Sequence, residues 1–191
     1  MSSRARSPEP QCAEPGHILP SVVARILLAS CVLGVFQQPA RTPDIHFTPT
    51  RHAIADAMLQ LAEVGPADVV YDLGSGDGRI PIIAAQKYGA TAVGIEINPI
   101  LVEQSWRNAN DAQVADKVKF IVADLFEADL SAATVITLYL SPSIMQILEP
   151  RLRGLKAGTR IVSHQFPMPR WLPDKRVTVA ESELLLWRVP K

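Results

Sequence analysis

The chain has few cysteines and no excess of charge of either sign. Of its 191 residues only Cys12 and Cys31 are cysteines, and both lie within the first 40 or so positions. The rest of the sequence therefore offers neither a disulfide framework nor a cysteine-based metal site. Lysine plus arginine and aspartate plus glutamate each number 19, so no positive excess is available to hold a phosphate backbone. Nucleic acid is thus a disfavoured partner.

Histidines do not supply a metal site either. His46 and His52 flank the start of a predicted helix without the spacing of metal ligands, so no bound metal is expected. His164 ends a predicted strand, where it could face a cleft or serve as a hydrogen-bonded structural side chain.

Apolar runs and helical periodicities alternate along the chain from residue 49 onward. This alternation predicts an α/β fold with a mainly parallel, doubly wound sheet, and the last two runs predict an antiparallel hairpin at its edge. The expected helices cover residues 49–64, 79–88, 99–110 and 144–155. The expected strands cover residues 69–72, 92–97, 118–122, 133–140, 160–164, 177–180 and 184–189.

The first expected helix has a buried face and a candidate cap. Ile54, Met58 and Leu61 recur at helical spacing, which places them on one side. Thr48 or Thr50 is a plausible N-terminal cap, because a threonine hydroxyl can accept a hydrogen bond from a free helical N–H.

The most informative stretch is residues 69–80 (VVYDLGSGDGRI), in which an acid ends a buried strand before three closely spaced glycines. Such glycines form a turn where the backbone can meet a ligand without interference from Cβ atoms. The dinucleotide pattern G-x-G-x-x-G requires a glycine where Arg79 stands, so a nicotinamide cofactor is disfavoured. Asp72 and Asp77 place negative charge beside the turn, which suits a ligand with an ammonium group.

Two further acids follow neighbouring strands. Glu96 ends the second expected strand, where a carboxylate can accept hydrogen bonds from both hydroxyls of a ribose. Asp124 follows the third expected strand, which places it at the same edge of the sheet. S-Adenosylmethionine carries an ammonium, a sulfonium cation and a ribose diol, so the three acidic strand ends predict this cofactor and methyl transfer.

Three motifs resemble the class I, seven-strand S-adenosylmethionine-dependent methyltransferases: DLGSGDGR at 72–79, GIEINP at 94–99 and VADLFEADL at 122–130. Two more, FTPT at 47–50 and FPMPRW at 166–171, resemble the protein-lysine methyltransferases that act on the ATP synthase c subunit and the adenine nucleotide translocase. The resemblance covers roughly residues 44–175. It implies a Rossmann-like, seven-stranded sheet and a lysine side chain of a protein as methyl acceptor.

The resemblance also implies roles for individual residues. Asp77 would contact the amino-acid end of the cofactor, Glu96 the ribose, and Asp124 with Leu125 the adenine. The loop around the methionine moiety would be formed by Asp72, Gly74, Ser75, Gly76 and Gly78, and Ile97 and Asn98 would line the same site.

The acceptor side carries a weaker pattern. Tyr139, at the end of the fourth strand beside Ser141 and Pro142, is the candidate for lining an acceptor channel. The Asn/Asp-Pro-Pro-Tyr sequence of enzymes that methylate nucleobases and glutamine is absent, which disfavours an amide or base substrate. A core aromatic role for Tyr139 is equally compatible with the sequence.

The first 41 residues form a tail of different composition. Residues 1–16 are typical of a disordered segment, and residues 26–36 (ILLASCVLGVF) form an uncharged apolar run. Eleven helical residues reach about 16 Å, well short of the roughly 30 Å of membrane hydrocarbon, so the run is expected to be a signal or short anchor. A single methyltransferase domain is expected over residues 42–191.

Location follows from the cofactor, which is made and held inside cells. An exported enzyme would lack its methyl donor, so we expect association with a membrane on a side that contains the cofactor, such as the bacterial cytoplasmic side or the mitochondrion. A misassigned start codon would also explain the tail.

A small-molecule methyltransferase and a noncatalytic cofactor-binding module are the alternative functions.

Overall fold

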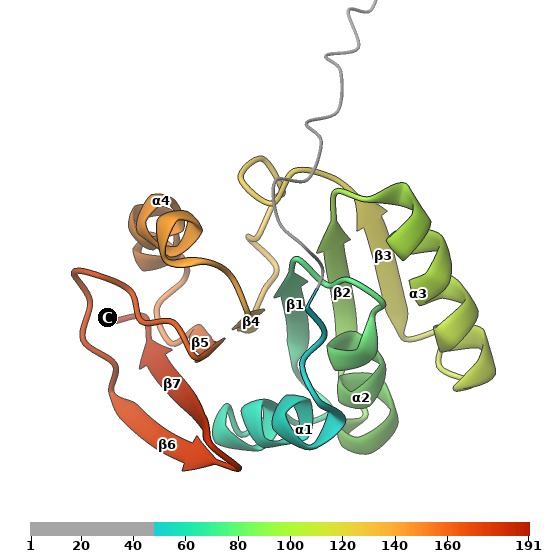
Figure 1. The fold of residues 1–191 in the computed structure, drawn as a ribbon, viewed down its shortest axis with the longest axis horizontal. Coiled ribbons are helices and arrows are strands. Elements are labelled where there is room, and N and C mark those ends of the chain that lie inside the picture. The colour runs from blue at the N-terminus through green and yellow to red at the C-terminus, as the bar shows by residue number, and fades with distance from the viewer. Residues whose placement is uncertain (1–47) are drawn as a thin grey trace, which may run out of the picture. The chain divides into compact units, whose positions relative to one another are not determined.

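Figure 1 shows the fold of the protein in a computed structural model, which describes residues 48–191. The tail over residues 1–41, its apolar run at 26–36 and Phe47 lie outside the described residues. The strands are β1 (Val69–Leu73), β2 (Thr91–Glu96), β3 (Val118–Val122), β4 (Val135–Leu138), β5 (Arg160–His164), β6 (Lys175–Val179) and β7 (Ser182–Arg188). The helices are α1 (His52–Leu61), α2 (Arg79–Tyr88), α3 (Pro99–Asp111) and α4 (Pro142–Arg153).

The seven strands form one sheet in the order β3-β2-β1-β4-β5-β7-β6. β1 to β5 are parallel, and β7 runs antiparallel between β5 and β6, which confirms the predicted doubly wound sheet and its C-terminal hairpin. The strand order reverses at β1, which pairs with β2 on one side and β4 on the other. In open parallel sheets, ligands bind at the carboxyl ends of the strands at such a reversal.

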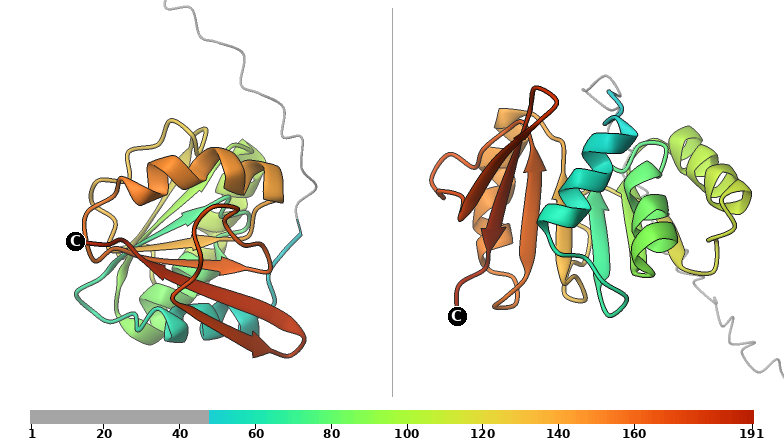
Figure 2. Two further views of the ribbon diagram at one scale, coloured as in Figure 1. Left: turned by 90° about the vertical axis from the view of Figure 1, so that its left-hand side faces the viewer. Right: turned by 90° about the horizontal axis from the view of Figure 1, so that it is seen from below.

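Helices cover both faces of the sheet. Side chains of α1, α2 and α3 pack in one buried cluster, and those of α4 pack with Trp187 in a second cluster on the other face. The left view of Figure 2 shows α4 and α1 on opposite sides of the sheet. Among residues 48–191, no helix has the length and apolar character needed to cross a membrane.

Two expected boundaries were wrong for tertiary reasons. α1 begins at His52, and its N-cap is Arg51, whose side chain makes no capping hydrogen bond. The expected cap Thr50 instead directs its hydroxyl toward His164, 3.4 Å away. The strand expected over 133–140 is shorter, because Tyr139 leaves the sheet after Leu138 and lines a cleft.

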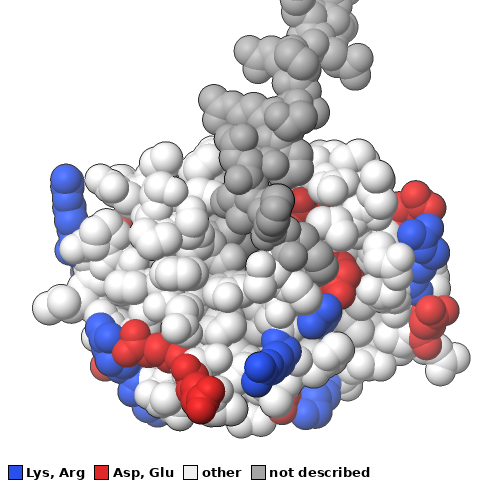
Figure 3. All heavy atoms as spheres, in the orientation of Figure 1, with Lys and Arg blue, Asp and Glu red and all other residues white. Residues whose placement is uncertain are grey.

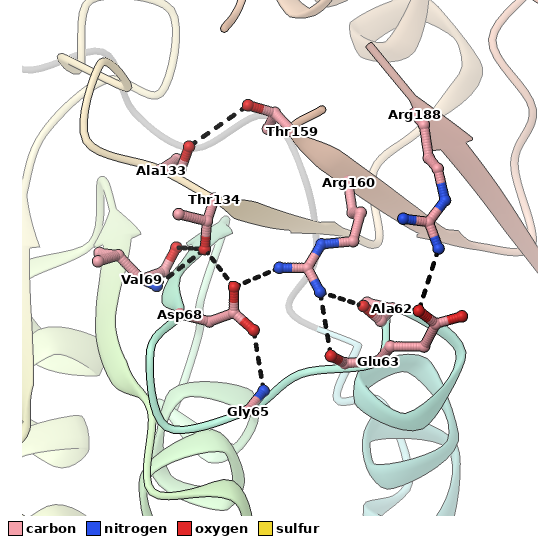
Figure 4. Close-up of polar contacts among 10 residues, drawn as sticks. All are labelled: Ala62, Glu63, Gly65, Asp68, Val69, Ala133, Thr134, Thr159, Arg160 and Arg188. Atoms are coloured by element: carbon pink, nitrogen blue, oxygen red, sulfur yellow. Dashed lines mark hydrogen bonds and ion pairs between the residues drawn. The ribbon is translucent and has the colours of Figure 1, made fainter. Parts of the chain in front are cut away.

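A network of polar side chains ties together the amino ends of the parallel strands (Figure 4). Asp68, just before β1, accepts hydrogen bonds from the Thr134 hydroxyl at 2.7 Å and the Gly65 N–H at 2.8 Å, and it pairs with Arg160. The Arg160 guanidinium also donates to the carbonyl of Ala62 at 2.7 Å, at the end of α1. Burial alone would raise the pKa of Asp68, but these hydrogen bonds and Arg160 hold it below its usual range. Arg160 thus joins α1, β1 and β5 at one point.

This network predicts unequal effects of two arginine substitutions that Figure 4 shows side by side. Arg160→Gln should lower the free energy of unfolding by about 2 kcal/mol, because it leaves a half-buried carboxylate and helix-end carbonyls without their partner. Arg188→Gln is the matched control: its pair with Glu63 is solvent-exposed, so its loss should cost less than about 0.5 kcal/mol. Urea unfolding monitored by circular dichroism measures both, and equal effects would contradict the structural role of Arg160.

Candidate functional site

A cleft of about 620 Å³ opens at the carboxyl ends of β1 to β4. It lies where the strand order reverses, as expected for a ligand site in this topology. Residues 48–50, the loop after β1 and the start of α4 also contribute to its walls. Ten residues that the sequence singled out line it: Asp72, Gly74, Ser75, Asp77, Glu96, Ile97, Asn98, Asp124, Leu125 and Tyr139.

The glycine-rich loop after β1 lies unusually close to the neighbouring strand. An added Cβ at Gly78 would stand 2.7 Å from the Phe120 ring, and one at Gly94 would stand 2.6 Å from both the Phe120 ring and the Ser75 hydroxyl. Gly76 and Gly78 are buried and do not line the cleft. Gly76 and Gly78 therefore determine the shape of the loop through their backbone conformations, with positive φ angles of 54° and 79°. Gly74, in contrast, lines the cleft.

Asp72 is the most strongly perturbed acid of the cleft. Its side chain is buried, and it accepts a 2.7 Å hydrogen bond from the hydroxyl of Thr137 on β4. Burial raises the pKa of Asp72 to about 7, and the nearby charges of Glu96 and Asp77 act in the same direction. A buried carboxylate with one neutral donor is costly in its charged form, so this site favours a cationic ligand group.

Glu96 at the end of β2 is held by backbone amides. Its Oε2 accepts from the Gly76 N–H at 3.0 Å and its Oε1 from the Asn98 N–H at 2.9 Å. A carboxylate offers about four acceptor positions, so two remain for hydroxyl donors such as a ribose diol. The side chain of Asn98 accepts from the Ile100 N–H and thereby caps α3.

The acid after β3 is also fixed by a local turn. Asp124 Oδ1 accepts a hydrogen bond from the Phe126 N–H at 2.9 Å, and its backbone carbonyl accepts from the Glu127 N–H. Leu125 and Phe126 line the cleft beside it. This arrangement of an acid next to apolar side chains suits a flat aromatic base with an amino group.

Asp77 pairs with Arg79, a contact that the sequence analysis did not predict. Its two carboxylate oxygens accept hydrogen bonds from Arg79 Nε at 2.9 Å and Nη2 at 2.5 Å. The remaining Nη1 of Arg79 donates to the backbone carbonyl of Thr50 at 2.7 Å. If Asp77 contacts the amino-acid end of the cofactor as expected, its carboxylate would bind both Arg79 and the cofactor.

Directly after β4, the Tyr139 ring stacks with two aromatic neighbours. The ring of His164 lies 4.2 Å from it and that of Phe166 lies 6.1 Å away, both nearly parallel to it. Gln165 joins the two with φ of 72°, and a hydrogen bond from the Phe166 N–H to the His164 carbonyl closes the turn. A three-residue turn with positive φ is strained, and such strain persists where the surrounding structure holds it, often at functional sites.

His164, which stacks on Tyr139, is a buried side chain. It is 7% exposed, and burial lowers the pKa of its imidazole. Its Nδ1 lies 3.4 Å from the Thr50 hydroxyl. His164 does not itself line the cleft, but it stacks on Tyr139, which does, and so supports that ring.

Sequence patterns did not reveal every residue of the cleft. Arg79 and Thr50 were assigned to helix starts, and Ile144 and Ile147 of α4 carried no functional pattern, yet all four line the cleft. Their positions depend on contacts between distant parts of the chain. A basic residue directly after the glycine loop was the one local indication, because it could pair with Asp77.

The residues present fit S-adenosylmethionine. Ser75 lines the cleft, and its hydroxyl, which lies beside Gly94, is the one buried side-chain polar atom among the described residues without a hydrogen-bond partner. Acids at three successive strand ends match the ammonium, the ribose diol and the adenine amino group in turn.

Comparison with known proteins agrees with this geometry. The family model of the ANTKMT methyltransferase domain matches residues 72–175. A protein-lysine N-methyltransferase of Saccharolobus islandicus is 37% identical over 144 residues, which cover 74% of this chain and 89% of that protein. The human lysine N-methyltransferase for the ATP synthase c subunit is 35% identical over 162 residues, covering 83% of this chain and 69% of that protein.

A solved structure from Salinibacter ruber is also similar. It is described as an RNA methyltransferase in complex with S-adenosyl-L-homocysteine, and it is 52% identical, with a TM-score of 0.74. The match covers 75% of this chain and 95% of that chain.

The burial of Asp72 predicts opposite effects of one substitution on stability and on ligand binding. Because the pKa of Asp72 is raised above its unfolded value, its contribution to stability is present at low pH and is lost as the pH rises through about 7. Asp72→Asn should therefore make the ligand-free protein at least as stable as the parent at pH 8. It should weaken binding of S-adenosylhomocysteine about tenfold or more, because a charge-assisted hydrogen bond is lost.

Thermal unfolding between pH 5 and 8 and titration calorimetry measure the two effects. In the parent protein, affinity should also fall below pH 7 as Asp72 becomes protonated, and it should approach the affinity of Asp72→Asn. Asp116→Asn, which changes an exposed acid, is the control. Parent-like affinity in Asp72→Asn would contradict the assignment of this carboxylate to the ligand.

Proposed function

Because this chain belongs to the family of ANTKMT methyltransferase domains and is an S-adenosylmethionine-dependent methyltransferase, we propose that its acceptor is the side-chain amine of a lysine in a membrane-associated protein. The names of the curated relatives support a protein lysine as acceptor. The negative charge of the cleft supports an amine as the acceptor, and the apolar mouth of the cleft supports a membrane-associated protein as the substrate.

The charge of the cleft is the observation that carries the proposal. Four carboxylates line it: those of Asp72, Asp77, Glu96 and Asp124. Among the described lining residues Arg79 is the one lysine or arginine, and Asp77 already pairs with it. A cleft of this charge attracts an ammonium group and repels a phosphate backbone.

The mouth of the cleft beside Tyr139 is apolar. Ile144 and Ile147 of α4 line it, and Ile147 is 63% exposed. The other exposed residues on the first two turns of α4, Pro142, Ser143 and Gln146, are also uncharged. In Figure 3 the surface over α4 is largely free of charged atoms. An apolar approach surface suits a substrate whose target lysine is flanked by apolar side chains, as in a membrane protein.

The same reasoning gives a location. The enzyme can methylate only a lysine that is exposed on the side of the membrane where S-adenosylmethionine is available. We therefore propose that the protein acts at a membrane facing a compartment that contains S-adenosylmethionine, such as the bacterial cytoplasmic side or the mitochondrion.

The chemistry asks the chain mainly for positioning. When bound, S-adenosylmethionine supplies a methyl group activated by a sulfonium. The acceptor amine, with an unperturbed pKa of about 10.4, must lose its proton to water before its lone pair can form the new C–N bond, while the methyl–sulfur bond would break and the sulfur would leave as a neutral thioether. The apolar mouth favours the neutral amine by removing water, and Tyr139 and Leu140 line the path to the cofactor end.

A second candidate acceptor is RNA, which the description of the Salinibacter ruber protein favours. The acidic cleft argues against it in this chain. A phosphate backbone would need several lysine or arginine contacts, and the described part of the cleft provides one arginine that is already paired.

Transfer of radiolabel from S-adenosylmethionine distinguishes the acceptors. The full-length protein is incubated with a membrane fraction, with total RNA and with a small-molecule extract, and the label is followed in each. We expect label in a membrane protein, recovered as methyllysine after acid hydrolysis, and a loss of about tenfold or more with Asp72→Asn. Label in RNA would replace the lysine proposal with the second candidate, and label confined to small molecules would contradict both.

A further inference from the structure

Arg79 contacts two parts of the cleft that are far apart in sequence. Its Nε and Nη2 bind both oxygens of Asp77 in the glycine-rich loop, at 2.9 and 2.5 Å. Its Nη1 binds the carbonyl oxygen of Thr50 at 2.7 Å, in the segment of residues 48–50 that precedes α1. The side chain is 19% exposed, so these contacts are sheltered from water. One guanidinium therefore holds the 48–50 segment against the cofactor loop.

The 48–50 segment continues this line of contacts to the acceptor end. Thr50 is buried, and its hydroxyl lies 3.4 Å from Nδ1 of His164. The His164 ring stacks on Tyr139 at 4.2 Å, and Tyr139 lines the apolar mouth. A continuous line of contacts therefore runs from the glycine loop to Tyr139, through Asp77, Arg79, Thr50 and His164.

The start of α1 does not provide a second side-chain anchor for the 48–50 segment. The N-cap of α1, Arg51, makes no side-chain capping bond, so the start of that helix does not fix the segment through its own sequence. Both Thr48 and Pro49 are exposed and line the cleft. Within the described part of the chain, the side-chain hydrogen bonds that position the segment are those of Thr50, through its carbonyl at Arg79 and its hydroxyl at His164.

We propose that Arg79 is a positioning residue that couples the two ends of the cleft, so that binding of the cofactor at the glycine loop orders the 48–50 segment and, through Thr50 and His164, sets Tyr139 for the acceptor. The inference rests on the proposed function only in placing the acceptor at Tyr139. A coupling between two sites is reciprocal, so an acceptor bound at Tyr139 also strengthens cofactor binding.

A purely electrostatic role for Arg79 predicts something different. If it only neutralised Asp77, a lysine would serve equally well. A lysine ammonium is a point charge and lacks the planar fork that binds Asp77 and Thr50 together. Arg79→Lys therefore separates the two roles, and Thr50→Val tests the next contact by removing the hydroxyl while keeping the carbonyl.

Hydrogen exchange of the full-length protein tests the coupling without any acceptor. Addition of saturating S-adenosylhomocysteine should slow exchange across residues 48–60 of the parent, and this protection should be lost in Arg79→Lys although the ligand still binds. Arg107→Lys is the matched control, because Arg107 pairs with Glu103 on the exposed face of α3. Parent-like protection in ligand-bound Arg79→Lys would overturn the proposal.

Steady-state kinetics then tests the acceptor end. Arg79→Lys and Thr50→Val should raise the KM for the acceptor roughly tenfold, while the Kd for S-adenosylhomocysteine in Thr50→Val stays close to that of the parent. An unchanged KM in both variants would also overturn the proposal. If the acceptor is not a lysine, the exchange experiment keeps its meaning, so failure of the proposed function and failure of the coupling are distinguishable.

Discussion

The site depends on the close approach of the glycine-rich loop to β2 and Phe120. Side chains at Gly78 or Gly94 would overlap the Phe120 ring, and one at Gly94 would also overlap the Ser75 hydroxyl. With both positions free of Cβ atoms, the Gly74 and Ser75 N–H groups reach the carbonyl of Ile95 at 2.8 and 3.0 Å. The loop then lies across the end of β2, and this brings Asp72, Glu96 and Ser75 to one cleft.

That arrangement has an electrostatic cost that the cofactor can offset. Asp72 is buried among other acids, with the Thr137 hydroxyl as its donor, and its pKa rises to about 7. A folded protein that keeps such a group forgoes stability above neutral pH. The ammonium group of a ligand would stabilise the charged Asp72 carboxylate. The buried acid that lowers the stability of the ligand-free fold therefore favours binding of the cofactor.

Sequence reasoning succeeded where a role follows from local chain geometry. An apolar run that ends in Asp72 before three glycines fixes a strand, a turn and a helix, and the observed α2 has the predicted bounds of residues 79–88. Glu96 and Asp124 follow because parallel strands place their carboxyl ends at one edge. The mainly parallel sheet and the antiparallel hairpin were predictable from the alternation of apolar runs and helical periodicities, whereas the order of the strands was not predicted.

The rest could not be predicted because it depends on contacts across long stretches of chain. The bond from Arg79 to the Thr50 carbonyl spans 29 positions, and the approach of Thr50 to His164 spans 114. The hydroxyl expected to cap α1 is used in the second contact. Gln165 has no sequence feature that favours positive φ, so the strained turn between His164 and Phe166 becomes visible only in the folded protein.

The most direct test of this account is the affinity of Gly94→Ala for S-adenosylhomocysteine, measured by calorimetry beside Gly154→Ala. A methyl at Gly154 would lie 3.5 Å from its nearest neighbour, an ordinary contact, so this control should bind as the parent does. Gly94→Ala should displace Ser75 and Phe120 and weaken binding by tenfold or more, corresponding to about 1.4 kcal/mol or above. Parent-like affinity in a folded Gly94→Ala protein would contradict the central claim that the close approach of the loop to β2 builds the cofactor site.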